Sequence, residues 1–264
     1  GFSAGAAMTT GTHNTLLGAG AGDTLTTGAA NVAVGSGALT AENAHGRNVA
    51  VGFNSLATLD AGQNAYNVAV GYAAGVLMTT SNHTTIVGGL AGDALTTGNS
   101  NTFVGAYSGS AATIGNTNTA VGRDSLLTNV AGDRNTAIGY QSLRVMTAAS
   151  TTDTFNTALG YHSGLAVTSG IKNTIIGASA GAALTTPGHN VAVGYASQGS
   201  ATTGEFNTSL GGLSMGTGVT TGDNNVALGY QAGKAITSGG VNTLVGNNAG
   251  DALTTGSANV VVGH

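Results

Sequence analysis

A five-residue motif that ends with glycine recurs fifteen times along the chain, and every copy except the one at Thr84 begins with asparagine. The interval between motifs is 17 residues in eleven of fourteen cases, and 19, 21 or 18 residues in the other three. A fixed period this short predicts one small unit stacked on copies of itself, and not a single globular core. The motifs begin at Asn14, Asn31, Asn48, Asn67, Thr84, Asn101, Asn118, Asn135, Asn156, Asn173, Asn190, Asn207, Asn225, Asn242 and Asn259.

We call the segment from one motif start to the next a coil, and we number each coil from its first residue, position 0. Position +4 is glycine in every motif, which indicates a backbone angle that only glycine adopts freely, or an approach too close for a Cβ atom. Position +1 is Thr or Val and position +3 is Val, Ile or Leu, on either side of a mostly small residue at +2. This alternation of β-branched residues predicts a short strand.

The second half of each coil is also regular. Position +7 is Ala or Ser in every complete coil, and an apolar residue near +11, such as Leu25, precedes Thr-Thr-Gly or a related turn. The pattern predicts a strand, a glycine corner, a short second strand and a polar turn, with no helix. The longer intervals predict loops at residues 60–66 and 149–155. We expect the position 0 asparagines to form a column in which each side chain hydrogen-bonds its equivalents above and below.

A single coil buries too few side chains to fold alone. Three or four buried side chains at roughly 1.5–3 kcal/mol each do not offset about 1–2 kcal/mol of backbone entropy per residue. Stability must therefore come from neighbouring coils. We expect residues 1–264 to form a single array of about 15 coils. At roughly 4.8 Å per layer the array would be a rod on the order of 70 Å long.

Composition excludes several classes of protein. Only 6% of the residues are charged and 41% are hydrophobic, which does not fit a disordered chain. The net charge is −4 and the six Lys and Arg residues form no stripe, so we expect no nucleic-acid partner. No apolar run approaches the roughly 20 residues that span a bilayer, so we expect no membrane contact. The chain begins and ends within the repeat pattern, which indicates a segment of a longer fibrous chain.

The sequence Asn-Val-Ala-Val-Gly at 31–35, 48–52, 67–71 and 190–194, with Asn-Thr-Ala-Ile-Gly at 135–139, resembles the head repeat of trimeric autotransporter adhesins. Related repeats occur in some phage tail fibres, and the additional Leu-Thr-Thr-Gly segment is more similar to that variant. The resemblance implies a left-handed parallel β-roll, a homotrimer of chains packed side by side, and attachment to a host-cell or matrix surface. It also implies an extracellular location, on a bacterial surface or a phage virion.

The small residues at +2 and +7 bear on oligomerisation independently of the resemblance. Ala and Ser would let the wall of a second chain approach closely, which favours a close partner. They would equally fill the narrow interior of one coil.

Aromatic side chains recur at position +5, where Phe53 shares a column with five tyrosines. An exposed aromatic row can stack on sugar rings, so these residues are candidates for glycan or surface binding. Alternatively, they cover a seam between chains. The tyrosines are Tyr72, Tyr140, Tyr161, Tyr195 and Tyr230.

We expect no metal, cofactor or catalytic site. The recurring aspartates Asp23, Asp93, Asp133, Asp223 and Asp251 occur at most once per coil, which favours turn residues that bond their own backbone over a calcium site. No two of the six histidines have metal-ligand spacing, and nothing places a nucleophile beside a base.

The sequence therefore predicts a non-enzymatic, structural and adhesive fibre segment that holds repeated weak contacts on a stiff support. A purely structural, self-assembling extracellular filament is one alternative. Another is an ice-binding solenoid, suggested by the Thr-Thr pairs, although these are interrupted at 43–44, 130–131 and 148–149. A polysaccharide-cleaving solenoid is a third, and it lacks an evident carboxylate pair.

Overall fold

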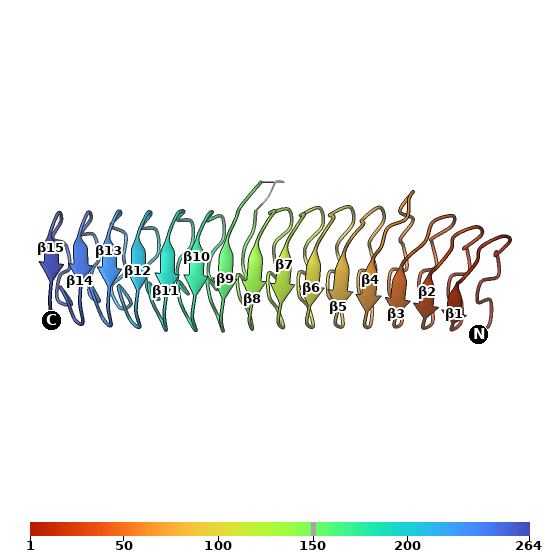
Figure 1. Ribbon diagram of the computed structural model, residues 1–264, viewed down its shortest axis with the longest axis horizontal. Helices are drawn as coiled ribbons and strands as arrows, with labels where there is room; N and C mark the ends of the chain where they lie inside the picture. Colours follow the sequence, from red (N-terminus) through yellow and green to blue (C-terminus); the bar gives the residue numbers. More distant parts are fainter. Residues whose placement is uncertain (149–151) are drawn as a thin grey trace. The chain divides into compact units, whose positions relative to one another are not determined.

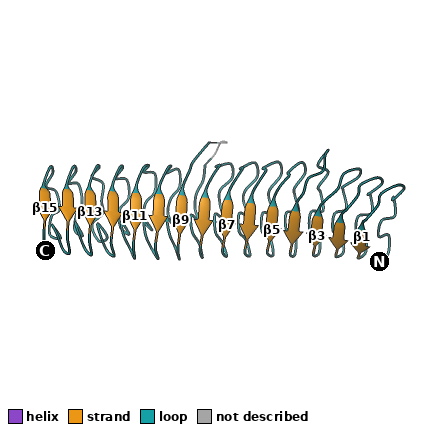
Figure 2. Ribbon diagram, in the orientation of Figure 1, coloured by secondary structure: helices purple, strands orange, loops and turns teal. Residues whose placement is uncertain are grey.

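The computed structural model describes residues 1–148 and 152–264, and it places one three-residue strand in each coil (Figures 1 and 2). The chain divides into two compact units. The first contains Gly1–Asp133 with Thr152, and the second contains Arg134–Ala148 and Asp153–His264. The strands of the first unit are β1 (Thr15–Leu17), β2 (Val32–Val34), β3 (Val49–Val51), β4 (Val68–Val70), β5 (Thr85–Val87), β6 (Thr102–Val104) and β7 (Thr119–Val121).

The second unit repeats this arrangement. Its strands are β8 (Thr136–Ile138), β9 (Thr157–Leu159), β10 (Thr174–Ile176), β11 (Val191–Val193), β12 (Thr208–Leu210), β13 (Val226–Leu228), β14 (Thr243–Val245) and β15 (Val260–Val262). The described residues include no helix long and apolar enough to cross a membrane.

Within each unit, consecutive strands pair in parallel and in register. Val32 pairs with Val49 in the first unit and Thr174 pairs with Val191 in the second, so equivalent positions of adjacent coils lie side by side. The predicted fold class, an all-β parallel solenoid with coils of about 17 residues, is confirmed at this level.

The invariant glycine at +4 has a backbone angle that disfavours other residues, and it also lies too close to the next coil for a Cβ atom. Gly88 has a φ of +144°, outside the range that other residues readily adopt. A Cβ atom on Gly88 would also lie 2.5 Å from the carbonyl oxygen of Gly105 in the next coil. The corner after each strand therefore requires glycine for its backbone angle and for the spacing between coils.

The predicted second strand is wrong. Positions +6 and +8 adopt the left-handed conformation in successive coils, as at Asn54 (φ 52°) and Leu56 (φ 49°). An extended strand cannot contain positive φ angles at alternate residues. The segment after the glycine corner is therefore a series of tight turns, and β1–β15 are the only strands among the described residues.

The core follows a rule of complementary volumes at positions +2 and +8. Where +2 is small, +8 is often large, as in the pair Ala33 and Leu39. Where +2 is large, +8 is glycine, as in the pair Phe103 and Gly109. A Cβ atom on Gly109 would lie 2.7 Å from the Phe103 ring, so the two positions share one volume. No coil of the described chain carries a large side chain at both positions.

The small residues at +2 and +7 lie inside the coils. Ala50 and Ser55 are fully buried within one chain, and the Ser55 hydroxyl donates to the carbonyl oxygen of Ala69 in the next coil at 3.0 Å. The small residues at +2 and +7 therefore fill the interior of one coil, and they do not form a surface against which a second chain could pack.

The coil that begins at Asn48 holds two extra residues, and its loop between β3 and β4 extends beyond its neighbours (Figure 1). Ala65, inside the predicted loop at 60–66, is fully buried and anchors the return to the next strand. In the second predicted loop, at 149–155, residues 149–151 lie outside the described residues.

Candidate functional site

The position 0 asparagines connect adjacent coils and also close their own coil. Asn173 shows both bonds: its Oδ1 accepts the backbone N–H of Asn190 at 3.0 Å, and its Nδ2 donates to the carbonyl oxygen of Pro187 at 2.9 Å. Direct side-chain bonds between asparagines occur at some steps, such as Asn242 to Asn225 at 2.9 Å. The asparagines that are almost fully buried are Asn31, Asn48, Asn67, Asn101, Asn118, Asn135, Asn156, Asn173, Asn190, Asn207, Asn225 and Asn242, while Asn14 and Asn259 are half-buried.

A second polar ladder lies two residues before the motif in four consecutive coils, at Asn82, Asn99, Asn116 and Asp133. Asn99 Oδ1 accepts the backbone N–H of Asn82 at 2.9 Å, and Asn116 Oδ1 accepts that of Asn99 at 2.9 Å. Asp133 continues the ladder by accepting the N–H of Asn116 at 2.6 Å. This ladder was not predicted from the sequence, although asparagine at +15 in three consecutive coils was a usable signal.

Three of the recurring aspartates, Asp93, Asp133 and Asp223, accept hydrogen bonds from adjacent coils, which differs from the expected bonds to their own backbone, whereas Oδ1 of Asp23 is buried without a partner among the described residues. Asp93 accepts the Ser110 hydroxyl at 2.6 Å, and Asp223 accepts the backbone N–H of Glu205 at 2.7 Å. Because adjacent coils are one strand spacing apart, a short carboxylate reaches the next coil easily.

The tyrosines at +5 are all exposed, with exposed fractions from 37% for Tyr140 to 64% for Tyr195. Phe53 and Tyr72 stack with their ring centroids 5.6 Å apart, and Tyr140 and Tyr161 stack at 5.5 Å. Tyr195 and Tyr230 lie on either side of Gly212 and have no stacked aromatic partner at +5 in an adjacent coil. Each paired ring covers one face of its partner, whereas Tyr195 has no stacked partner and the Tyr230 ring lies beside Gly212.

A second surface row is formed by the residue immediately before each motif, at position +16 in the 17-residue coils. These residues have positive φ angles that direct their side chains outward. Tyr66 stacks on His83 at 5.4 Å and His189 stacks on Phe206 at 4.8 Å. The guanidinium of Arg47 lies 5.2 Å from the Tyr66 ring centroid. The row therefore combines aromatic and cationic groups.

The threonines of the Thr-Thr pairs contribute to the hydrogen bonding between coils. The hydroxyl of Thr96 donates to the carbonyl oxygen of Thr113 at 2.9 Å, and that of Thr185 donates to Thr202 at 3.2 Å. The donors at position +12 are therefore used within the protein.

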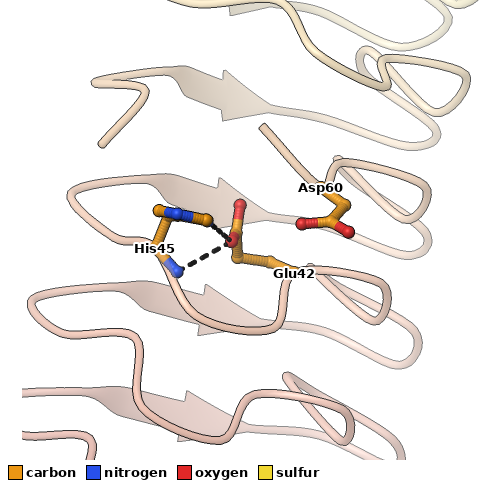
Figure 3. Close-up of side chains that lie close together, drawn as sticks. All are labelled: Glu42, His45 and Asp60. Carbon is orange, nitrogen blue, oxygen red and sulfur yellow. Dashed lines mark hydrogen bonds and ion pairs between the residues drawn. The ribbon is translucent and has the colours of Figure 1, made fainter. Parts of the chain in front are cut away.

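One cluster of side chains departs from the repeat chemistry, and it was not predicted from the sequence. Glu42 occupies position +11, where the adjacent coils carry Leu25 and Leu59, and its side chain is fully buried. His45 follows three residues later in the same coil, and Asp60 approaches from the next coil (Figure 3). One ligand atom from each residue lies within 4.8 Å of the others. The signal was a single glutamate in an otherwise mostly apolar column.

Hydrogen bonds fix the Glu42 carboxylate. Its Oε1 accepts the backbone N–H of His45 at 3.0 Å, and its Oε2 lies 3.5 Å from the backbone nitrogen of Ala61. Burial raises the pKa of Glu42, an effect that these backbone bonds and the neighbouring His45 oppose and that Asp60 reinforces. Nδ1 of the His45 ring is buried without a hydrogen-bond partner, 3.5 Å from Glu42 Oε1.

The described residues enclose no pocket, so the candidate sites are surface rows and the Glu42 cluster. Together, the fold and these sites define a parallel β-solenoid with regular rows of side chains on its surface. Comparison with models of known protein families, with curated proteins and with solved structures finds no match to this chain.

Proposed function

We propose that this chain is a segment of an extracellular structural and adhesive fibre, such as the head of a surface adhesin or the shaft of a phage tail fibre. The observation that carries the proposal is the exposed aromatic row at +5, which presents the same chemistry on several coils of each unit. Repeated weak contacts on one support gain affinity through multivalency. The function is binding and not catalysis.

Glycans are the class of ligand that best fits this row. Aromatic rings stack on the apolar faces of sugars, and the tyrosine hydroxyls bond to sugar hydroxyls at the same time. Tyr195 is the most exposed tyrosine of the row at 64%, and neither Tyr195 nor Tyr230 is stacked on an aromatic neighbour at +5.

The proposed assembly is a homotrimer of left-handed rolls packed side by side. Its support comes from the outer face of the strands, because the small residues at +2 and +7 are used inside each coil. Position +3 places an apolar side chain on this face in every coil, and Leu159 and Leu210 remain 44% and 50% exposed. An apolar strip repeated along a sheet favours burial against another copy of the chain.

Binding of the chain to a glycan array and to host-cell monolayers tests the adhesive function. Serine already occupies +5 at Ser36, so Tyr195→Ser with Tyr230→Ser preserves the fold and should reduce binding at least about tenfold if the contacts are multivalent. Leu77→Ser with Val219→Ser, which removes exposed apolar side chains elsewhere, is the matched control. Equal binding by all three proteins would refute the adhesive function and leave a purely structural filament.

The mass of the assembled species tests the oligomer separately. We expect a trimer that Leu159→Lys with Leu210→Lys dissociates, because burying lysine ammonium groups at the seam is costly. A monomeric wild-type chain would refute the trimer without affecting the glycan test.

A further inference from the structure

Burying the Glu42 carboxylate costs free energy, and the fold does not require a carboxylate at this position. A leucine at this position would continue the core, as Leu25 and Leu59 do in the adjacent coils. A buried carboxylate is tolerated when it is paired, hydrogen-bonded or bound to a metal. Two backbone N–H groups satisfy part of this requirement for Glu42.

Closing the local turn does not explain the charge. Asn129 occupies position +11 in the coil that begins at Asn118, and it closes the equivalent turn with a neutral side chain. Its Oδ1 accepts the backbone N–H of Gly132 at 3.0 Å, as Glu42 Oε1 does from His45. The turn therefore does not need a carboxylate. A carboxylate is, however, a better ligand for a cation than an asparagine side chain is.

The other two side chains have the chemistry and the placement of metal ligands. His45 Nδ1 is buried and lacks a hydrogen-bond partner, although an acceptor lies 3.5 Å away. Two ligands of a tetrahedral ion, each about 2.0–2.1 Å from the metal, are about 3.4 Å apart. The distance between His45 Nδ1 and Glu42 Oε1 fits this ligand-to-ligand distance. The exposed Asp60 carboxylate lies within 4.8 Å and can rotate toward the same point.

We propose that Glu42, His45 and Asp60 form a binding site for a divalent transition-metal ion of the zinc class. One nitrogen and two carboxylate oxygens suit zinc and its first-row neighbours, whereas calcium requires six or more oxygens. Because Asp60 belongs to a different coil from Glu42 and His45, the ion clips two consecutive coils together. Asn31 holds the backbone at His45, since its Nδ2 donates to the His45 carbonyl oxygen at 3.1 Å. Water completes the coordination of the ion.

Calorimetric titration of the metal-free full chain with zinc tests the site. We expect one zinc ion per chain, a higher midpoint of thermal unfolding, and a tetrahedral absorption spectrum when Co²⁺ replaces zinc. Glu42→Asn reproduces the chemistry of Asn129 and keeps the turn, so the variant should fold and lose at least about tenfold in zinc affinity. His45→Ala and Asp60→Asn should show the same loss.

Glu42→Leu provides a second variant, which restores the apolar column and should unfold at a higher temperature than the metal-free parent while binding no zinc. His264→Ala with Asp251→Asn removes a histidine and a carboxylate far along the sequence and is the matched control. Either of two results would overturn the site: the absence of stoichiometric zinc binding, or an equal loss of affinity in the control.

Discussion

The complementary volumes at +2 and +8 predict that a destabilising core substitution can be repaired within the same coil. Phe103 is fully buried, and its ring occupies the space beside both Gly109 and Gly92. Phe103→Ala leaves a cavity and should lower the free energy of unfolding by about 3–5 kcal/mol. Gly109→Leu alone should cost about 1–3 kcal/mol, because its Cβ would lie 2.7 Å from the ring.

The double variant Phe103→Ala with Gly109→Leu should be more stable than Phe103→Ala alone. It reproduces the next coil, where Ala120 and Leu126 occupy the same positions and Leu126 accepts the left-handed backbone with a φ of 51°. The coupling free energy between the two substitutions should therefore be favourable by about 2–3 kcal/mol.

Native-state hydrogen exchange is the suitable assay, because it reports the stability of individual coils in a repeat protein. The exchange of amides in β5, β6 and β7 should be fast in Phe103→Ala and slower in the double variant. Phe103→Ala with Gly250→Leu is the matched control, since Gly250 faces Leu244 in the other unit and the two losses should simply add. Additive losses in the test pair as well would refute complementary packing.

Two further predictions concern the backbone and the asparagine column. Val241 is a β-branched residue with a φ of 59°, and it is 62% exposed. Val241→Asn, which copies Asn224 one coil earlier, should raise the free energy of unfolding by about 1 kcal/mol. A lower midpoint of thermal unfolding in this variant would contradict backbone strain at Val241. Asn173→Ala should lower the free energy of unfolding in chemical denaturation by about 2–4 kcal/mol, because it leaves the Asn190 N–H and the Pro187 carbonyl without their partner. A smaller decrease than that of Ser36→Ala on the surface would refute the contribution of the asparagine column to stability.

The sequence was sufficient to predict the features that repeat in every coil. The invariant glycine and the alternation at +1 to +3 predict the strand, its corner and the register of stacking, because each coil must match its neighbours. The second strand was predicted wrongly because +8 is glycine in some coils and a larger residue, most often leucine, in others, and nothing in a leucine indicates a left-handed backbone. Leu39 and Leu56 adopt that conformation because the coil must turn there.

The features that occur once, or that depend on two positions together, were harder to predict. The exchange of volume between Phe103 and Gly109 is visible only when +2 and +8 are known to face the same space. The cluster around Glu42 joins residues 18 positions apart, and the 19-residue coil that supplies Asp60 breaks the regular spacing. The spacing of the six histidines along the sequence gives no sign of a site, because only the stacked coils bring His45 close to two carboxylates.

The in-register pairing of each strand with the next one along the chain also has a kinetic consequence. Every strand pairing in a unit closes a loop of about one coil, so its entropic cost is small and nearly the same at each step. Folding can begin wherever two neighbouring coils first meet and then spread in both directions, with each finished coil serving as the template for the next. Despite being all-β and parallel, such a chain has a low contact order and should fold quickly for its length.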